Sequence, residues 1–266
     1  MTALTEQHFE RTRRLALELA GIELVERHRA LLGRRTARAG ITDEASLDSL
    51  LDAAEEGEPG ATRRLLTLVT TKFTGFFRHP AQLDRAAEHA LRVAREDGNA
   101  HVWSAATASG EEPYSLAITL LEASGQEAPP VRIVATDVDA EALEIALHGE
   151  YNGAAMAAIQ PELRERFFSE TEVAGRWRVS NAVRTLVAFS TLNLVSQEWP
   201  IEGPFAVILC RNVLMYLEPS YRLAVLTRMT GLLRRDGLLI LDPTEHLGAA
   251  ADLFTPGVDG IYSLKR

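Results

Sequence analysis

At residues 102–114 the chain reads Val102-Trp103-Ser104-Ala105-Ala106-Thr107-Ala108-Ser109-Gly110-Glu111-Glu112-Pro113-Tyr114. An apolar run, then small residues, then a proline suited to the first turn of a helix is typical of a strand, a loop and a helix in succession. Small side chains let a ligand approach the loop backbone, and the helix N-terminus offers N–H donors. The pattern predicts the ligand-binding turn of an α/β fold.

The composition of this turn argues against a dinucleotide. A dinucleotide-binding turn carries three glycines and no carboxylate, because the pyrophosphate binds at the helix end. Here Gly110 is followed by Glu111 and Glu112. Two carboxylates would repel a diphosphate but suit a ligand with an ammonium group, such as S-adenosylmethionine (SAM), which also carries a sulfonium and has no phosphate. The alternative is that both glutamates only interact with the helix dipole.

A further acidic residue follows the next apolar run, in Val134-Ala135-Thr136-Asp137-Val138-Asp139. An acid at the end of this strand in a doubly wound fold accepts hydrogen bonds from ribose hydroxyls, so Asp137 is the predicted ribose ligand. The alternative role for Asp137 is the N-cap of the next helix. Asp139 could fill that role equally well.

From residue 101 onward, short apolar runs alternate with helical stretches, which predicts βαβ units around a parallel sheet. The predicted strands cover residues 102–106, 132–136, 205–210, 238–241 and 262–264. The predicted helices cover residues 112–123, 140–148 and 220–233, with Arg235-Asp236-Gly237 as the turn after the last one. The connection over residues 151–192 is too long for a simple crossover. Within it, residues 176–179 and 185–189 are predicted to form a small antiparallel hairpin.

The first ~75 residues predict short helices, with Thr5 capping the first and Gly21 ending it. The others are predicted at residues 23–39, 45–56 and 61–73. On the second helix, Arg27, Arg34 and Arg38 share one face, which is either a solvated surface or a docking face for an acidic partner. We therefore expect a helical domain at residues 1–75, a linker and first helix at 76–100, and a sheet domain at 101–266 with a β insert at about 167–190.

Composition restricts the classes of function. The 266 residues are 46% hydrophobic and 24% charged, as in an ordinary globular protein, and a net charge of −9 argues against a nucleic-acid-binding protein. Cys210 is the one cysteine, which excludes an intramolecular disulfide and a cysteine-based zinc cluster, and we expect no metal. The sequence lacks an apolar run long enough to span a membrane and a signal-peptide pattern, so we expect a cytoplasmic protein without membrane insertion.

Five segments in a fixed order carry a family resemblance. They are Thr74-Gly75-Phe76-Phe77-Arg78, the turn from Trp103 to Ser115, Ala135-Thr136-Asp137-Val138-Asp139, Asn193-Leu194, and Cys210-Arg211-Asn212-Val213-Leu214-Met215-Tyr216. Together they resemble the CheR-type chemoreceptor glutamate O-methyltransferases over nearly the whole chain. The resemblance implies an α/β, Rossmann-like SAM-dependent methyltransferase fold with a helical N-terminal domain and a small antiparallel β insert.

The resemblance also assigns roles in cofactor binding to residues along the chain. It implies that Thr74 and Arg78 contact SAM, that Glu111 holds the ammonium or neighbouring groups of its methionine part, and that Asp137 holds the ribose. It implies further that Asn193 and Leu194 flank the adenine, that Arg211 and Asn212 close the pocket, and that Tyr216 lies near the methyl group. The basic second helix, with Arg27, Arg34, Arg35 and Arg38, is similar to the family's receptor-docking surface.

The implied activity is methyl transfer from SAM to glutamate side chains on the cytoplasmic helices of methyl-accepting chemoreceptors. The products are glutamyl methyl esters and S-adenosylhomocysteine (SAH). An ionised glutamate needs no general base, so the enzyme has mainly to position and desolvate the reactants. Arg78 either orients the incoming carboxylate or holds the carboxylate of SAM, and Tyr216 either donates at the reacting centre or only forms a wall. We expect the protein to act as a monomer.

Two segments depart from the family pattern. Lys72 stands where the family usually carries asparagine, and Pro243-Thr244-Glu245 stands where it tends to show His-Ser-Glu. The lead-in to the β insert, residues 172–175, is short, so we expect no tethering through a receptor-tail pentapeptide. The alternative functions are a SAM- or SAH-binding signalling module without methyl transfer, and a nicotinamide-dependent oxidoreductase, which the missing glycine triplet disfavours.

Overall fold

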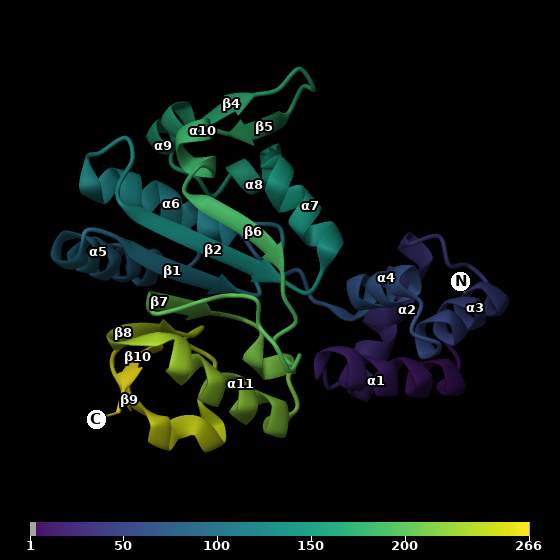
Figure 1. Cartoon of the computed structure of the whole chain (residues 1–266). Helices are drawn as coiled ribbons and strands as arrows, with labels where there is room; N and C mark the ends of the chain where they lie inside the picture. The colour runs from purple at the N-terminus through teal and green to yellow at the C-terminus, as the bar shows by residue number, and fades with distance from the viewer. Residues whose placement is uncertain (1–3, 266) are drawn as a thin grey trace.

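The computed structural model describes residues 4–265, and its N-terminal part is a bundle of short helices (Figure 1). The helices are α1 (Glu6–Ala20), the 3-10 helix η1 (Glu26–His28), α2 (Arg29–Arg38), α3 (Glu44–Glu55) and α4 (Pro59–Val69). The Thr5 side chain accepts a hydrogen bond from the N–H of His8, and Gly21 ends α1 in a left-handed conformation, as the sequence predicts. Phe9 and Leu51 are fully buried at the centre of the bundle.

The second helix begins later than predicted. Instead of starting at Glu23, the helical turns start at Glu26. The preceding residues are held in extended form by the sheet domain, because Ile22 forms a β-bridge with Leu217 and Glu23 donates its N–H to the carbonyl of Tyr216 at 2.8 Å. Local periodicity does not encode this pairing, which joins segments far apart in the sequence.

The fourth helix is shorter than predicted. It ends at Val69 rather than at Phe73, because Thr70 adopts an extended conformation with ψ 145°. Residues 70–79 therefore form a linker that crosses from the bundle to α5 (Pro80–Asp97), which has Pro80 at its first position.

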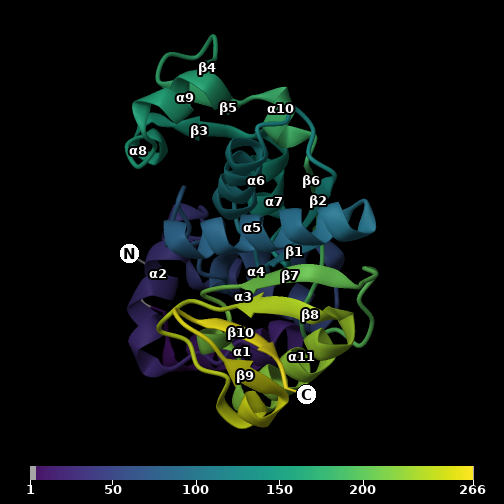
Figure 2. The ribbon, with the colours of Figure 1, turned by 90° about the vertical axis from the view of Figure 1, so that its left-hand side faces the viewer.

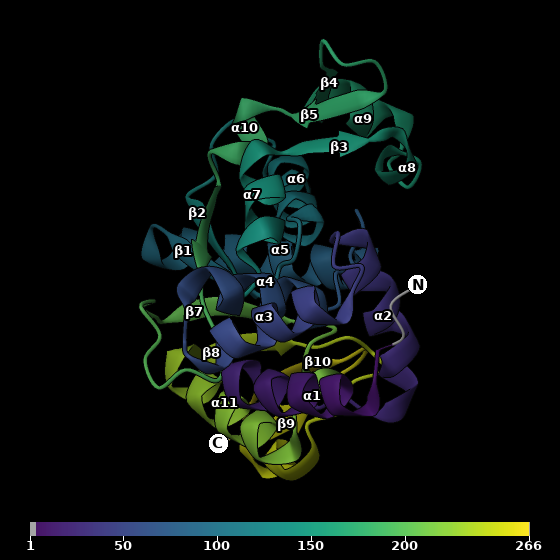
Figure 3. The same cartoon turned by 90° about the vertical axis from the view of Figure 1, so that its right-hand side faces the viewer.

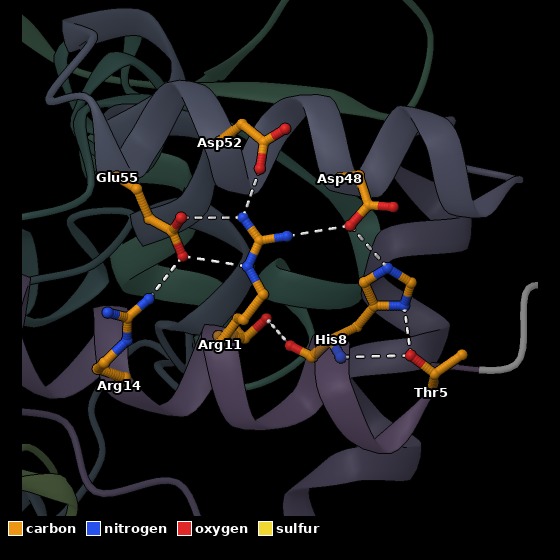
Figure 4. A network of polar contacts seen from close by, with 8 residues as sticks. Thr5, His8, Arg11, Arg14, Asp48, Asp52 and Glu55 are labelled. Carbon is orange, nitrogen blue, oxygen red and sulfur yellow. Dashed lines mark hydrogen bonds and ion pairs between the residues drawn. The ribbon is translucent and has the colours of Figure 1, made fainter.

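A polar network joins α1 to α3 (Figure 4). The Arg11 guanidinium donates to Asp48 at 3.0 Å, to Asp52 at 2.5 Å and to Glu55 at 3.0 Å, and the ring of His8 bonds to Asp48 at 3.1 Å. The hydrogen bonds that Arg11 donates to Glu55 and Asp52 raise the pKa of Arg11. The network fixes the direction of α1, whose C-terminal end borders the cleft described below.

Within the described residues, seven strands form one sheet in the order β6-β2-β1-β7-β8-β10-β9. Their bounds are β1 (Ala100–Ala105), β2 (Val131–Asp137), β6 (Val187–Thr191), β7 (Phe205–Cys210), β8 (Leu233–Ile240), β9 (Phe254–Pro256) and β10 (Ile261–Leu264). The pairs from β6 to β8 are parallel, and β10 is antiparallel to both β8 and β9. The predicted Rossmann-like α/β class is confirmed, and each of the five predicted strands is present.

Helices cover both faces of the sheet (Figures 1 and 2). On one face, α5 and α6 (Glu111–Ser124) pack in one apolar cluster with Val102 and Ile133. On the other face, α11 (Pro219–Leu232) and η3 (Gly248–Leu253) pack with Trp103 and Ile208. Alternate residues of β1 thus enter different cores. Helix α7 (Ala140–His148) packs along β2 and β6. None of the described helices is long and apolar enough to cross a membrane.

The predicted hairpin is wrong. Residues 187–191 form β6, the edge strand of the main sheet, parallel to β2. The small antiparallel sheet consists instead of β3 (Glu150–Asn152), β5 (Arg176–Val179) and β4 (Phe168–Glu170), with the short helices α8 (Gly153–Met156), α9 (Pro161–Phe167) and α10 (Asn181–Arg184) beside it (Figure 2). An edge strand is half exposed, so its sequence alternates like a hairpin strand and does not reveal a parallel partner.

The turn predicted at Arg235-Asp236-Gly237 is also wrong, because these residues lie within β8. The strand is irregular at this point. Phe205 pairs with Leu233, whereas Val207 pairs with Leu238, so the residues between Leu233 and Leu238 bulge out of register. A bulge uses the same small and polar residues as a turn, which accounts for the difference.

Candidate active site

The edge of the sheet where β1, β2 and β7 end faces the helical bundle (Figures 1 and 3). A cleft lies at this edge. Its central lobe, about 740 Å3 including space open to solvent, is lined by the end of α1, by linker residues 70–72 and by the loops after β1, β2, β6 and β7. An adjoining linker lobe of about 400 Å3 is lined by linker residues, by the loop after β1 and by Arg211. The chain leaves β1 toward β2 on one side and β7 lies on the other, and α/β folds bind ligands at such a switch point.

The loop after β1 forms the floor of both lobes. Ala106 and Ala108, which line both, adopt left-handed conformations with φ 58° and 49°. Gly110 follows with φ 92°, and a Cβ at this position would lie 2.7 Å from the Cβ of Ala146. The loop therefore needs glycine at residue 110, and its alanines leave the backbone accessible to a ligand.

The two glutamates at the start of α6 occupy different environments. Glu112 lines the linker lobe, where its carboxylate accepts hydrogen bonds from Arg211 at 2.9 Å and from the Ser104 hydroxyl at 2.8 Å. Glu111 is absent from the lining of both lobes; its carboxylate accepts from the Ser109 hydroxyl at 2.7 Å, and burial raises its pKa. Successive helix positions point about 100° apart. The structure thus brings Glu112, and not the predicted Glu111, to the cleft.

Asp137 and Asp139 divide the two roles that the sequence left open. Asp139 caps α7, because its Oδ1 accepts from the N–H groups of Glu141 and Ala142 at 3.1 and 3.2 Å. Asp137 lines the central lobe at the end of β2 and accepts from the N–H groups of Ala108 at 2.7 Å and Asp139 at 2.8 Å. Burial raises the pKa of Asp137. Asp137 is therefore available to a ligand, whereas the carboxylate of Asp139 is committed to the protein.

Lys72 pairs with a carboxylate of the protein. Its Nζ lies 2.9 Å from Oδ2 of Asp139, and the hydroxyls of Thr67 and Thr70 donate to the same carboxylate at 3.0 and 2.9 Å. Burial opposes ionisation of Asp139, but the bonds from Lys72 and Thr70 outweigh it and lower the pKa of this side chain. The cation that departs from the family pattern is thereby neutralised, and the linker is attached to the N-terminus of α7.

Asn193 and Leu194, which the family resemblance assigns to the adenine, line the central lobe from the loop after β6. The Asn193 amide donates to the carbonyl of Leu19 at 2.6 Å, and its oxygen accepts from the N–H of Val195 at 3.1 Å. Asn193 therefore also holds the end of α1 against the sheet domain. Sequence reasoning missed this second contact.

Arg211 and Asn212 follow β7 and meet in the linker lobe. Arg211 is buried and donates to the carbonyl of Arg78 at 2.9 Å besides its ion pair. Asn212 has a left-handed φ of 58°, and its N–H donates to Oε2 of Glu245 at 2.8 Å. Glu245 is 3% exposed and also accepts from the N–H of Met215 at 3.3 Å. This residue of the departing Pro243-Thr244-Glu245 segment therefore shapes the loop that carries the predicted ligands.

The remaining predicted cleft residues come from two other segments. Thr74 and Arg78 line the linker lobe, and Tyr216, in the 3-10 helix η2 (Leu214–Tyr216), lines the central lobe. Nη2 of Arg78 lies 3.3 Å from Oδ2 of Asp242, a buried acid that sequence reasoning did not select. Its position directly after a strand of the sheet is the signal that could have found it.

The predicted docking residues divide into two groups. Arg27, Arg34 and Arg38 are exposed on η1 and α2. Arg35 points inward, where it donates to the carbonyl of Leu68 at 3.0 Å and to that of Val69 at 3.3 Å. Arg35 therefore attaches α2 to the end of α4, and its guanidinium is engaged by the protein.

Comparisons with known proteins show the family of the chain. Residues 72–257 match the family described as CheR methyltransferase, SAM binding domain. The chain is 35% identical to chemotaxis protein methyltransferase 2 of Pseudomonas aeruginosa, over 97% of this chain and 93% of that protein. It is 33% identical to the chemotaxis protein methyltransferase of Escherichia coli, over 99% and 93%, and 34% identical to that of Vibrio parahaemolyticus, over 100% of both.

Similarity to solved structures is more distant. The methyltransferase domain of bacterial-CtHen1-C aligns over 60% of this chain and 64% of that one, at 16% identity and a TM-score of 0.34.

Proposed function

The chain belongs to the CheR methyltransferase family, whose cofactor is SAM, and from that premise we propose that it methylates glutamate side chains on chemoreceptor cytoplasmic helices. The observation that carries the proposal is the cleft itself, where Asp137, Glu112, Arg78 and Tyr216 meet from four separate segments. The names of the relatives, all chemotaxis protein methyltransferases, support the class of acceptor.

The donor groups of the cleft fit SAM. Asp137 would accept hydrogen bonds from the ribose, and Asn193 and Leu194 would flank the adenine. The linker lobe offers one carboxylate, Glu112, and the guanidinium of Arg78, which suits a methionine end that carries one ammonium and one carboxylate. We assign Glu112 to the ammonium and Arg78 to the carboxylate.

The reaction needs little acid–base catalysis from the protein. Bound SAM would supply an electrophilic methyl group on its sulfonium, and this group would pass to a glutamate carboxylate oxygen of the receptor as the carbon–sulfur bond breaks and SAH leaves. A glutamate with an ordinary pKa near 4.3 is already ionised at neutral pH, so no general base is needed. The residues of the cleft hold the reactants in line, and such positioning can contribute roughly 7 to 11 kcal/mol of the barrier. Tyr216, between the lobes and the bundle, would exclude water and donate to the acceptor oxygen.

Recognition of the receptor is assigned to the exposed arginines on η1 and α2. Arg27, Arg34 and Arg38 offer positive charge to acidic receptor helices on a protein whose net charge is −9. Such an encounter weakens with salt.

We further propose that the protein is a cytoplasmic monomer that does not bind a receptor-tail pentapeptide. We also propose that the chain divides into domains after residues 75 and 100. The helical bundle would end at the first boundary, and the sheet domain would begin after the second.

The test is transfer of labelled methyl from SAM to receptor-enriched membranes of the native organism, followed by mild base, which releases methanol from methyl esters. We expect base-labile label with the wild-type protein and its loss in Arg78→Ala. Arg85→Ala is the matched control, because Arg85 is exposed on α5 and pairs with Glu88 outside the cleft. SAH binding without any base-labile label would instead favour a SAM- or SAH-binding signalling module.

A further inference from the structure

Asp242 is a buried acid near the end of β8, and one of its two carboxylate oxygens accepts no hydrogen bond from the described residues. Its side chain is 2% exposed. Oδ1 accepts from the N–H of Thr244 at 3.0 Å and from the Thr244 hydroxyl at 2.7 Å. Oδ2 is buried too and has no hydrogen-bond partner in the part of the chain that the structure describes. A buried carboxylate oxygen is costly unless a donor or a positive charge faces it.

Two side chains of the linker face Oδ2. Nη2 of Arg78 and Nε2 of His79 each lie 3.3 Å from it. These distances allow ion pairs, although the geometry does not align a hydrogen bond, so the oxygen orients Arg78 by charge. Burial raises the pKa of Asp242, but the bonds from Thr244, the side-chain amide of Asn212 and the charge of Arg78 outweigh this and hold the pKa well below its ordinary value. Asp242 is therefore ionised at neutral pH.

The other contacts of Arg78 constrain the position of its guanidinium less. Its Nη1 donates to the carbonyl of Phe73 at 3.3 Å, and the guanidinium lies 4.8 Å from the centre of the Phe73 ring. That ring is 71% exposed, so it adds little constraint. Asp242 is better fixed, because its N–H donates to Glu245 at 3.1 Å, the residue that also holds the loop after β7.

We propose that Asp242 is a positioning residue, whose Oδ2 holds the Arg78 guanidinium in the linker lobe so that it can bind the carboxylate of the methionine end of SAM. The inference rests on the proposed role of Arg78 in cofactor binding. The proposal gives a function to Asp242, which directly precedes the Pro243-Thr244-Glu245 segment that departs from the family pattern. From the end of β8, Asp242 orients an arginine of the linker in the cleft.

The test uses two ligands that differ at the methionine end. SAH carries the α-carboxylate, whereas 5′-methylthioadenosine keeps the adenine, the ribose and the sulfur but lacks that end. Asp242→Asn preserves the shape and the acceptor for Thr244 but removes the charge. By calorimetry we expect Asp242→Asn to weaken SAH binding about tenfold and to change the binding of 5′-methylthioadenosine less than twofold.

A double-mutant comparison separates positioning from a general structural role. Arg78→Ala should weaken SAH by at least as much as Asp242→Asn, and the double variant should bind SAH no more weakly than Arg78→Ala alone. Asp236→Asn is the matched control, because Asp236 also pairs with arginines, Arg92 and Arg234, but outside the cleft. It should bind both ligands like the wild-type protein.

Three results would overturn the proposal: unchanged SAH affinity in Asp242→Asn or in Arg78→Ala, equal weakening of both ligands, or additive losses in the double variant. If Asp242→Asn does not fold, Arg78→Gln still tests whether the loss is confined to the ligand with a carboxylate. Binding requires no methyl acceptor. The binding experiments therefore test the role of Asp242 even if the protein does not methylate receptors. Conversely, a negative binding result for Asp242 would not decide whether the protein transfers methyl groups.

Discussion

The carboxylate of Glu112 lies 2.9 Å from Nη1 of Arg211, joining the first turn of α6 to the end of β7. The Arg211 side chain is 2% exposed and that of Glu112 is 14% exposed, so the pair lies almost wholly out of water. Arg211 also donates to the backbone of Arg78. Through Arg211, this ion pair connects the start of α6, the end of β7 and the linker, and the shape of the linker lobe depends on it.

We predict that Glu112→Gln weakens SAH binding at least tenfold and lowers the free energy of unfolding by about 3 kcal/mol, because it leaves a buried arginine without its anion. Calorimetry and urea unfolding measure the two effects. Glu111→Gln is the matched control one residue away. Its SAH affinity should stay within twofold, and its stability should not fall, since burial already raises the pKa of Glu111 and disfavours the charge. If Glu111→Gln weakened SAH binding more than Glu112→Gln did, the assignment of Glu112 to the ammonium of SAM would be wrong.

SAH affinity should fall on acidification, and Asp137 should be the cause. Burial raises the pKa of Asp137, so it becomes protonated, and loses acceptor capacity for the ribose, at a higher pH than an ordinary aspartate with a pKa of 3.8. Asp139 has a lowered pKa and stays ionised in that window. Titration calorimetry from pH 8 to pH 4.5 should show the loss in the wild-type protein. Asp137→Asn should bind weakly with a flatter profile, and an equally steep fall in that variant would exclude Asp137 as the group.

The raised pKa of Asp137 also affects stability in the absence of ligand, with a sign opposite to that of binding. A group whose pKa is higher in the folded than in the unfolded protein contributes stability below its unfolded pKa, and this contribution is lost as the pH rises through the folded pKa. Asp137→Asn should therefore be at least as stable as the wild-type protein at pH 7 in urea unfolding, although it binds SAH less well.

The attachment of the linker through Asp139 can be tested without removing the cap of α7. Asparagine is as good an N-cap as aspartate, so Asp139→Asn retains the cap but loses the charge that pairs with Lys72. We expect a loss of about 1 to 2 kcal/mol in the free energy of unfolding and a few-fold weaker SAH binding, because linker residues 70–72 line the central lobe. Lys72→Met should show a smaller loss, since Lys72 is partly exposed and its pair is screened by water. Equal SAH affinity in all three proteins would show that this attachment does not shape the cleft.

The basic surface of α2 should separate into docking and structural arginines. Reversing the exposed charges, in Arg34→Glu with Arg38→Glu, should slow receptor methylation severalfold at low salt, with little effect at high salt or on SAH affinity. Arg35→Ala should instead lower the thermal midpoint by several degrees, because the carbonyls of Leu68 and Val69 lose their donor. Rates measured from low to high salt, beside melting curves, distinguish the two. A reversed variant whose rate equals that of the wild-type protein at every salt concentration would remove Arg34 and Arg38 from the docking surface.

Part of the site could be read from the chain because it depends on local order. Asp137 and the small-residue turn at Ala106 and Ala108 follow strands directly, and the carboxyl ends of parallel strands meet at one edge of a sheet. Asn193 and Tyr216 could be placed only through the family resemblance, since no local pattern marks them. The sequence could not show which of Glu111 and Glu112 lines the cleft, because both begin the same helix and periodicity alone does not say which side faces the cleft.

By itself, the sequence determined the strand–loop–helix order, the parallel sheet, the family and the kind of cofactor, because each of these is written in neighbouring residues or in short motifs. Tertiary structure alone decided that β6 joins the main sheet, that Arg35 faces α4, that Lys72 pairs with Asp139 and that Asp242 faces Arg78. The partners in these contacts lie tens to more than a hundred residues apart. Their choice depends on which groups packing brings together out of water, where an unpaired charge or donor is costly.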